Sequence, residues 1–301
     1  MCANCGCQAN QTTLLDLQTG ETTVLGEADH HNKEFAHPHE HDRGGVHSNA
    51  DYHHDHIVTH RHSPDEPLHS HHTHGHASVS TIDVNARILA KNDALAAKNR
   101  AWFAGREILA LNLVSSPGAG KTSLLERTIT ELAGKLPLYV IEGDQATAVD
   151  GDRIRAAGAS VVQVNTGTGC HLDAEMVSRA VAKLRPATGA MVLIENVGNL
   201  VCPALFDLGE RAKVVIFSVA DGEDKPLKYP HMFSAAGIVI LNKIDLLPHL
   251  DFSVEKAIEN LRRINNEAIV LQLSARTGEG MSAWCDWLLS EAAAAQQATF
   301  A

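Results

Sequence analysis

The fold of this 301-residue chain is decided by the stretch Asn112-Leu-Val-Ser-Ser-Pro-Gly-Ala-Gly-Lys-Thr-Ser123. An apolar run precedes it and a helical pattern follows it, which is the setting of a phosphate-binding loop between a strand and a helix. The small residues Gly118 and Gly120 let backbone N–H groups face phosphate oxygens. Lys121 is expected to reach the β- and γ-phosphates, and Thr122 to ligate Mg²⁺.

The choice of base is predicted by Asn242-Lys-Ile-Asp245, which follows another apolar run. The Asp245 carboxylate can accept hydrogen bonds from both N1–H and N2–H of guanine, a pair of donors that adenine lacks. Lys243 can lie over the base and Asn242 can brace the loops, while Ser274-Ala-Arg276 resembles the last base-contacting loop of GTPases. The chain is therefore predicted to bind and hydrolyse GTP. The expected nucleotide contacts are Gly118, Ala119, Gly120, Lys121, Thr122, Ser123, Asn242, Lys243, Asp245, Ser274 and Ala275.

Two acidic strand ends are candidates for holding Mg²⁺, because carboxylate oxygens suit this hard ion. They are Asp144, in Glu142-Gly-Asp144, and Glu195, in Glu195-Asn-Val-Gly198. Either carboxylate could instead cap the helix or turn that follows. The predicted catalytic set is Lys121, Thr122, Asp144 and Glu195. No Asp-x-x-Gly-Gln sequence is present to position water, so slow intrinsic turnover is expected.

Outside these motifs, short β-branched apolar runs alternate with helical segments from Glu107 onward. Such runs are typical of strands buried on both faces, so we predict a doubly wound α/β domain over 107–295 with a mostly parallel sheet. Residues 82–106 predict an amphipathic helix in which Ile88, Leu95 and Trp102 repeat every seven positions. This helix is expected to pack on the GTPase domain, or alternatively on a second protomer.

The first eighty residues have a different composition. Residues 1–7 form a cysteine motif, and 30–76 hold 16 of the 19 histidines in a tract with few large apolar side chains. We predict that 8–81 is a disordered, His-rich metal-binding segment. A formal charge of −11 argues against nucleic-acid binding. Without an apolar span or a signal peptide, no membrane association and a cytoplasmic location are expected.

The chain offers two groups of metal ligands. Cys2, Cys5 and Cys7 lie within six residues, and the terminal amine of Cys2 would supply a fourth donor if Met1 is removed. Thiolates with an amine favour Ni²⁺, and Zn²⁺ competes. Cys170-His171 and Cys202 follow strands on the phosphate side and form an incomplete shell for Zn²⁺ or Ni²⁺, which a two-fold dimer could complete. Cys285 is expected in the core.

These motifs together resemble the HypB family, the nickel-incorporation GTPases of [NiFe]-hydrogenase maturation. The residues that carry the resemblance are Cys2-x-x-Cys5-Gly-Cys7, Ser115-Ser-Pro-Gly-Ala-Gly-Lys-Thr122, Glu142-Gly-Asp144, Asn165-Thr-Gly-Thr-Gly-Cys-His171, Glu195-Asn-Val-Gly-Asn-Leu-Val-Cys202 and Asn242-Lys-Ile-Asp245. Ser115, which stands where the strict phosphate-loop pattern has glycine, is normal in this family.

The resemblance implies a SIMIBI-class GTPase that forms a homodimer with nucleotide and delivers Ni²⁺ toward the hydrogenase large subunit. It implies a high-affinity nickel site at Cys2, Cys5 and Cys7, and a second nickel or zinc site at Cys170, His171 and Cys202. A HypA-type zinc accessory protein is the implied partner. For the His-rich tract we expect nickel storage.

Two other interpretations remain open at this point. In the first, metal storage in the histidine tract is the main function and the GTPase is regulatory. In the second, the chain is a urease-type or cobalamin-type metallochaperone of the same GTPase class, against which the cysteine motif argues. A partitioning ATPase lacks support, because Ser116 stands where such proteins have a second lysine and Asp245 favours guanine.

Overall fold

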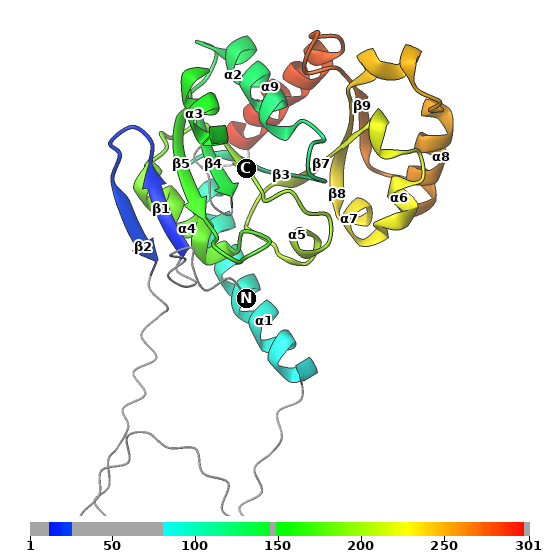
Figure 1. Ribbon diagram of the computed structural model, residues 1–301. Helices are drawn as coiled ribbons and strands as arrows, with labels where there is room; N and C mark the ends of the chain where they lie inside the picture. The colour runs from blue at the N-terminus through cyan, green and yellow to red at the C-terminus, as the bar shows by residue number, and fades with distance from the viewer. Residues whose placement is uncertain (1–11, 26–80, 145–148, 298–301) are drawn as a thin grey trace, which may run out of the picture. The chain divides into compact units, whose positions relative to one another are not determined.

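A computed structural model describes residues 12–25, 81–144 and 149–297 (Figure 1). The strands of this part form one sheet in the order β2-β1-β5-β4-β6-β3-β7-β8-β9. Strands β3 to β9 pair in parallel, whereas β1 pairs antiparallel with β2 and with β5. The strands are β1 Thr12–Asp16, β2 Thr22–Leu25, β3 Leu109–Ser115, β4 Leu138–Asp144, β5 Ser160–Asn165, β6 Met191–Glu195, β7 Ala212–Ser218, β8 Ala236–Asn242 and β9 Ile269–Gln272.

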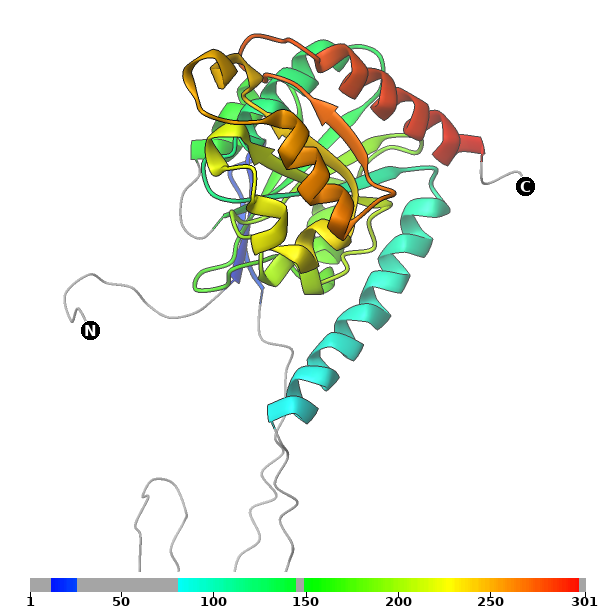
Figure 2. The ribbon, with the colours of Figure 1, turned by 90° about the vertical axis from the view of Figure 1, so that its right-hand side faces the viewer.

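Helices cover both faces of the sheet (Figures 1 and 2). Leu111 of β3 belongs to the core with α2, α3 and α9, and its neighbour Ala110 to the core with α1 and α4. Alternate residues of a strand point to opposite faces, so a strand buried on both faces is apolar throughout. The helices are α1 Thr81–Ala104, α2 Lys121–Leu132, α3 Val149–Ala156, α4 Ala174–Leu184, α5 Cys202–Leu205, α6 Lys225–Lys228, α7 Pro230–Ser234, α8 Val254–Ile264 and α9 Met281–Gln297, with 3₁₀ turns at Val219–Asp221 and Ile244–His249.

For residues 12–25 the expectation of disorder is wrong. They form the β1–β2 hairpin, and Leu14 is buried against Val177 and other residues of α4 and β5. In the register of β1 with β5, Thr13 lies opposite Asn165 and Asp16 opposite Val162. The predicted mostly parallel α/β sheet therefore gains two antiparallel strands at its edge, because pairing with β5 satisfies the backbone of a short, Thr-rich segment.

Helix α1 packs against α4, but not through the predicted seven-residue repeat. Ile88 is 50% exposed and Trp102 is 37% exposed. The buried face is instead formed by Asn92, Ala96, Asn99 and Phe103, which follow the spacing of successive helical turns. Its polar members accommodate polar backbone groups of the segments that it covers.

The predicted cysteine motif at 1–7 and the histidine tract at 30–76 lie outside the described residues. None of the helices in the described part of the chain has the length and apolar character needed to cross a bilayer.

Candidate functional site

The phosphate loop joins β3 to α2 at the carboxyl edge of the sheet. Gly118 and Gly120 have φ values of 74° and 97°, which residues with a side chain rarely adopt. A Cβ atom at Gly120 would lie 2.6 Å from Nδ2 of Asn242, so only glycine permits this approach. The loop therefore presents its backbone at the first turn of α2, as an anion-binding loop requires.

Lys121 is held within this loop. Its Nζ donates to Oγ of Ser115 over 2.9 Å, and both residues are buried. Burial lowers the pKa of Lys121, opposed by the nearby carboxylates of Glu195 and Asp150. The serine that stands in place of the first glycine of the strict pattern thus orients the lysine. A phosphate that accepts from Nζ would replace this neutral partner with a charged one.

Two buried carboxylates face the loop from neighbouring strands. Glu142 of β4 and Glu195 of β6 are paired in register, and Thr122 donates through Oγ1 to Oε1 of Glu195 over 2.8 Å. Burial, followed by the charge of Glu195, raises the pKa of Glu142 to about 9. Burial likewise raises the pKa of Glu195 to about 7. Oε2 of each carboxylate is buried without a hydrogen-bond partner among the described residues, a state that a cation would relieve.

Around these groups the fold leaves two adjoining cavities. The first, of about 450 Å³, is lined by the phosphate loop, Lys121, Thr122, Glu142, Asp144 and Glu195. The second, of about 800 Å³, is lined by Asn242, Asp245, Ala275 and Arg276. Gly120, Ser123 and Lys243 line both cavities. A charged compartment thus adjoins a larger one, which is the layout that a nucleoside triphosphate needs.

The base-side loops are tied to the phosphate loop. Asn242 donates through Nδ2 to the carbonyl of Ala119 and accepts through Oδ1 from the backbone N–H of Ala275. Lys243 donates through Nζ to the carbonyl of Gly118 over 2.6 Å. Asp245 accepts through Oδ1 from Oγ of Ser274 over 2.6 Å, which fixes the carboxylate at the wall of the second cavity.

The second predicted metal group also comes together. Sγ of Cys170 lies 2.8 Å from Sγ of Cys202 and 3.6 Å from Nδ1 of His171, and the three ligand atoms lie within 4.8 Å of one another. Cys170 and His171 come from the loop between β5 and α4, and Cys202 is the first residue of α5. The ring of Phe206 stacks on His171 at a centroid distance of 3.9 Å.

The pKa shifts at this cluster act in opposite directions on metal binding. The hydrogen bond to Cys202, with burial, raises the pKa of the Cys170 thiol, while burial lowers the pKa of His171. The lowered pKa keeps the imidazole neutral, as a ligand must be, whereas a cation has to displace the proton of the Cys170 thiol. Two sulfur donors and one nitrogen donor fit Ni²⁺ or Zn²⁺ rather than Mg²⁺.

Comparisons with known proteins agree with this geometry. The family model described as the CobW/HypB/UreG nucleotide-binding domain matches residues 109–272. The hydrogenase maturation factor HypB of Rhizobium leguminosarum bv. viciae is 57% identical over 227 residues, which is 75% of this chain and 75% of that protein. The chain belongs to the HypB family. The resemblance inferred from the motifs is confirmed, and with it the predicted P-loop GTPase fold and activity.

Similarity to HypB extends to other relatives and to solved structures. HypB of Escherichia coli K12 is 54% identical over 217 residues, covering 72% of this chain and 75% of that protein. The crystal structure of Helicobacter pylori HypB in complex with nickel matches with a TM-score of 0.63 and 36% identity, covering 67% of this chain and 95% of that one. HypB from Archaeoglobus fulgidus gives the same TM-score and identity, with 99% of its chain covered.

Three residues of the phosphate cavity in this HypB-family site were not predicted from the sequence. Glu142 is more deeply buried than the chosen Asp144, and it faces Glu195 directly in the register of the strands. Asp150 and Arg153 also line the phosphate cavity, where Arg153 pairs with Glu126 and Asp150. Strand alternation carries a usable signal for Glu142, because residues two apart, such as Glu142 and Asp144, share a face.

Cys285 is a core residue of this HypB-family chain, as expected. Its side chain is buried beneath α2, and burial raises the pKa of its thiol to about 11.

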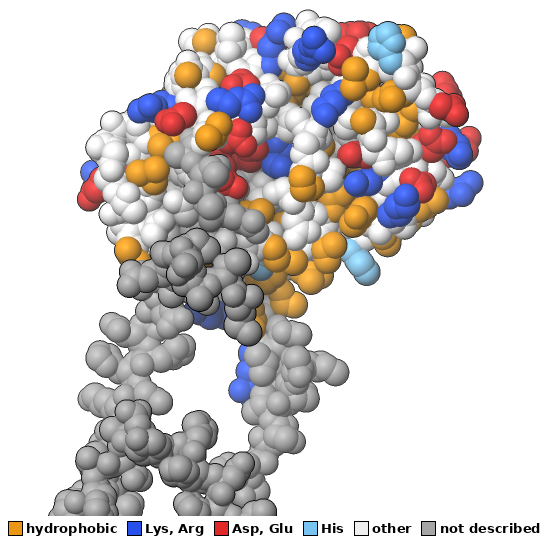
Figure 3. Space-filling model, in the orientation of Figure 1, with side chains coloured by type: hydrophobic (Ala, Val, Ile, Leu, Met, Phe, Trp, Pro, Cys, Tyr) orange, Lys and Arg blue, Asp and Glu red, His pale blue; other side chains and the backbone are white. Residues whose placement is uncertain are grey.

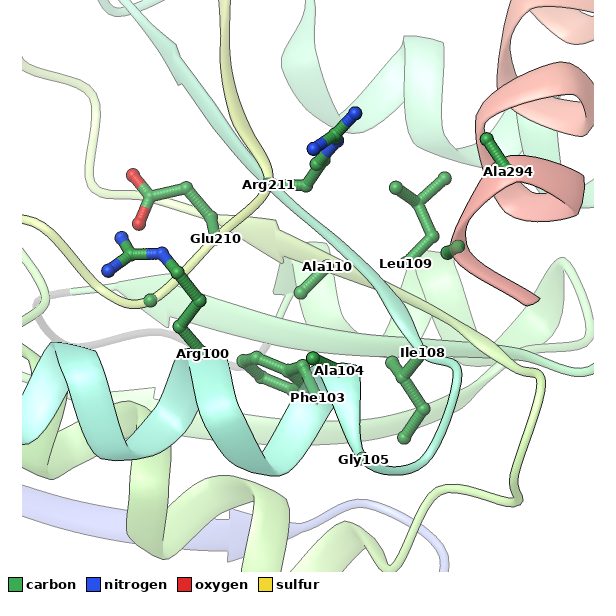
Figure 4. Close-up of a pocket in the computed structure, with 12 residues that line it drawn as sticks. Arg100, Phe103, Ala104, Gly105, Ile108, Leu109, Ala110, Glu210, Arg211 and Ala294 are labelled. Atoms are coloured by element: carbon green, nitrogen blue, oxygen red, sulfur yellow. The ribbon is translucent and has the colours of Figure 1, made fainter. Parts of the chain in front are cut away.

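A further cavity of about 480 Å³ lies near the amino end of β3, between α1, β3 and α9 (Figure 4). None of the nucleotide-contacting or metal-binding candidates lines this cavity.

Proposed function

We propose that this protein is a GTP-hydrolysing nickel metallochaperone, in which bound nucleotide controls the Cys170–His171–Cys202 site and thereby Ni²⁺ insertion into the [NiFe]-hydrogenase large subunit. One observation carries the proposal. The segment from Glu195 to Cys202 begins with the carboxylate bound to Thr122 of the phosphate loop and ends with a thiol of the metal cluster. A shift of this segment on binding GTP therefore moves one of the metal donors.

The nucleotide half of the mechanism requires Mg²⁺ as cofactor. Thr122, Glu195 and Glu142 fit this ion, because the two carboxylates keep buried oxygens without partners, and Asp144 lies on the same cavity. Bound Mg²⁺ would neutralise charge on the phosphates during hydrolysis. Lys121 would donate to phosphate in place of Ser115, and the charge of the cation would favour the ionised form of Glu195, which Thr122 holds in position.

Nickel is the cargo in this proposal. Cys170, His171 and Cys202 supply three donors, and a fourth comes from water, a homodimer partner or the recipient. The nickel complex of the Helicobacter pylori relative supports this cargo. Zn²⁺ fits the same donor set and competes for it. We further propose that Cys2, Cys5 and Cys7 form the tighter of the two nickel sites. We also propose that a HypA-type accessory protein exchanges metal with this protein in the cytoplasm.

The apolar surface over α5 supports a role in protein contacts. Val201 and Leu205 are 60% and 58% exposed beside Cys202, and hydrophobic side chains gather there (Figure 3). An exposed apolar group next to a metal donor suits transfer of the metal to another protein or subunit.

The control step obeys a simple condition. GTP shifts the metal site only if it binds two arrangements of the Glu195–Cys202 segment with different affinity. We therefore measure Ni²⁺ and Zn²⁺ affinity in the full chain carrying Cys2→Ala, Cys5→Ala and Cys7→Ala, with GDP and then with a non-hydrolysable GTP analogue. Thiolate-to-nickel absorption then reports only Cys170 and Cys202, because Cys285 is buried. A difference of about tenfold or more, or 1.4 kcal/mol, supports control by nucleotide, and equal affinities reject it.

For the histidine tract we propose nickel storage. Deleting residues 30–76 should lower the number of Ni²⁺ ions bound per chain, measured by equilibrium dialysis, without changing GTP turnover. An unchanged ion count would reject storage.

A further inference from the structure

Helix α1 buries two asparagines on the face that it turns toward the α/β domain. Asn92 and Asn99 are seven residues apart, or about two helical turns, and are 5% and 7% exposed. Asparagine is a poor helix former, and burial of its amide is favourable only when the amide is hydrogen-bonded. Two buried asparagines on one face of a helix therefore need hydrogen-bond partners.

Both side chains bind the same two segments of backbone. Asn92 accepts through Oδ1 from the N–H of Ala174 over 2.9 Å and donates through Nδ2 to the carbonyl of Asp207 over 2.8 Å. Asn99 donates through Nδ2 to the carbonyls of Ala174, over 2.8 Å, and Leu208, over 3.0 Å. Each asparagine is thus a bridge between Ala174 and the 207–208 segment.

These two segments carry the metal donors. Ala174 begins α4 three residues after His171, and Asp207 follows Cys202 by five residues. Phe206, next to Asp207, stacks on the ring of His171. The two segments that carry the metal donors are therefore joined to each other through side chains of α1.

Further contacts hold the 207–211 segment against α1. Arg100 donates to both carboxylate oxygens of Asp207 over 2.7 and 2.6 Å, and it extends from α1 on the side where Glu210 lies (Figure 4). Gly209 has a φ of 89°, and a Cβ atom there would lie 2.5 Å from the carbonyl oxygen of Ala96 and 2.6 Å from Cβ of Asn99. The loop therefore packs directly against the backbone of α1, at a distance that a side chain at position 209 would not permit.

We propose that Asn92 and Asn99 are positioning residues of the metal site, which set the separation between the Cys170–His171 arm and the Cys202 arm. This inference rests on the proposed function of that cluster. Its consequence is that displacement of α1 by a ligand or partner lowers affinity for the metal without any contact to the metal itself. Groups that orient metal ligands typically contribute about 10–100-fold to metal affinity.

The test uses the full chain with Cys2, Cys5 and Cys7 replaced by alanine, Ni²⁺ buffered by a chelator, and thiolate-to-nickel absorption as the signal. Asn99→Ser removes the two hydrogen bonds of that amide, to Ala174 and to Leu208. Asn92→Asp keeps the acceptor for Ala174 but loses the donor to Asp207, so it breaks one arm alone. Lys98→Ala, an exposed position of the same helix, is the matched control.

We expect Asn99→Ser to lower Ni²⁺ affinity by about 10–100-fold and Asn92→Asp by a smaller factor, while GTP turnover stays near that of Lys98→Ala. The melting temperature of the metal-free protein should fall only modestly, because each variant leaves buried backbone carbonyls without a donor. If Asn99→Ser fails to fold, Asn92→Asp decides. Unchanged Ni²⁺ affinity in the folded variants overturns the inference. Parallel losses of affinity, turnover and stability also overturn it, because they indicate a general structural role. Absence of the nickel signal in the parent chain instead rejects the proposed function of the cluster.

Discussion

The nucleotide site and the metal cluster are built at the same edge of the sheet, yet the fold holds them differently. The predicted nucleotide contacts are buried or hydrogen-bonded to one another, as Lys121 is to Ser115 and Asn242 to Ala119. The ligands of the metal cluster are half-buried, and their loops depend on contacts such as that of Asn199 with the carbonyl of Cys170. A pre-formed site favours tight, specific binding, whereas a site on two separate loops can change its geometry.

The largest expected effect concerns the nucleotide site. Lys121→Ala removes the only buried ammonium among the residues that line the described phosphate cavity. Loss of such a preorganised charge should lower the GTP turnover number by at least about 10²–10³-fold. Single-turnover hydrolysis measures the effect, and Lys98→Ala serves as control. Ni²⁺ affinity in the GDP-free protein should stay unchanged, and a comparable loss there would contradict the separation of the two sites.

The next effect concerns the base. Asp245→Asn replaces an acceptor for two guanine donors with an amide, so GTP affinity should fall by about 10–100-fold, the range of a lost bidentate pair. Xanthosine triphosphate should bind the variant better than GTP does, because its base offers an acceptor where guanine has the amino donor. Competition binding with both nucleotides gives the answer. Equal GTP affinity in variant and parent would remove Asp245 from the base site.

The metal cluster should respond to pH. Because the pKa of the Cys170 thiol is raised by its bond to Cys202, the proton is held to higher pH than in a free thiol. Metal binding must release that proton, so Ni²⁺ affinity should rise with pH through the neutral and alkaline range, by up to about tenfold per unit for each proton released. Cys202→Ser should flatten the profile. A profile that is flat in the parent chain would show that the thiols do not bind the metal.

The smallest expected effect concerns the buried carboxyl of Glu142, which should affect the stability of the protein and its GTP binding in opposite directions. The folded pKa of Glu142, about 9, is above its ordinary value of 4.5, so the buried carboxyl favours folding when protonated. This contribution is complete at pH 4, and it is lost as pH rises from about 4.5 toward 9. Glu142→Gln should therefore raise the melting temperature of the Mg²⁺-free protein at pH 8 by about 2–4 °C for each kcal/mol recovered, with little change at pH 4.5. Its Mg²⁺-dependent GTP binding should weaken.

The α/β fold and the strand-end positions of the nucleotide motifs could be predicted from the sequence, because their signals are local. Each strand end carries its functional residue within a few positions, as Glu195 and Asn242 do, and parallel strands end at one edge. The hairpin of β1 and β2 gave no such signal, since its short strands are stabilised by pairing with β5 about 150 residues later. The burial of Asn92 and Asn99 was not predicted, because a hydrophobic pattern assigns asparagine to the exposed face of a helix. Their burial depends on hydrogen bonds to backbone groups that are distant in the sequence.

The register of the hairpin has a topological consequence. Thr12 lies opposite Leu25, and Thr13 opposite Asn165, so both ends of the hairpin lie beside the carboxyl end of β5, where the loop to Cys170 begins. Cys7 is attached five residues before Thr12. A transfer of Ni²⁺ between that cysteine and the Cys170 loop of the same chain would be intramolecular, and its rate would then depend on the effective concentration that a short tether provides. Dilution of the protein would slow metal exchange between molecules but leave such an exchange within one chain at the same rate.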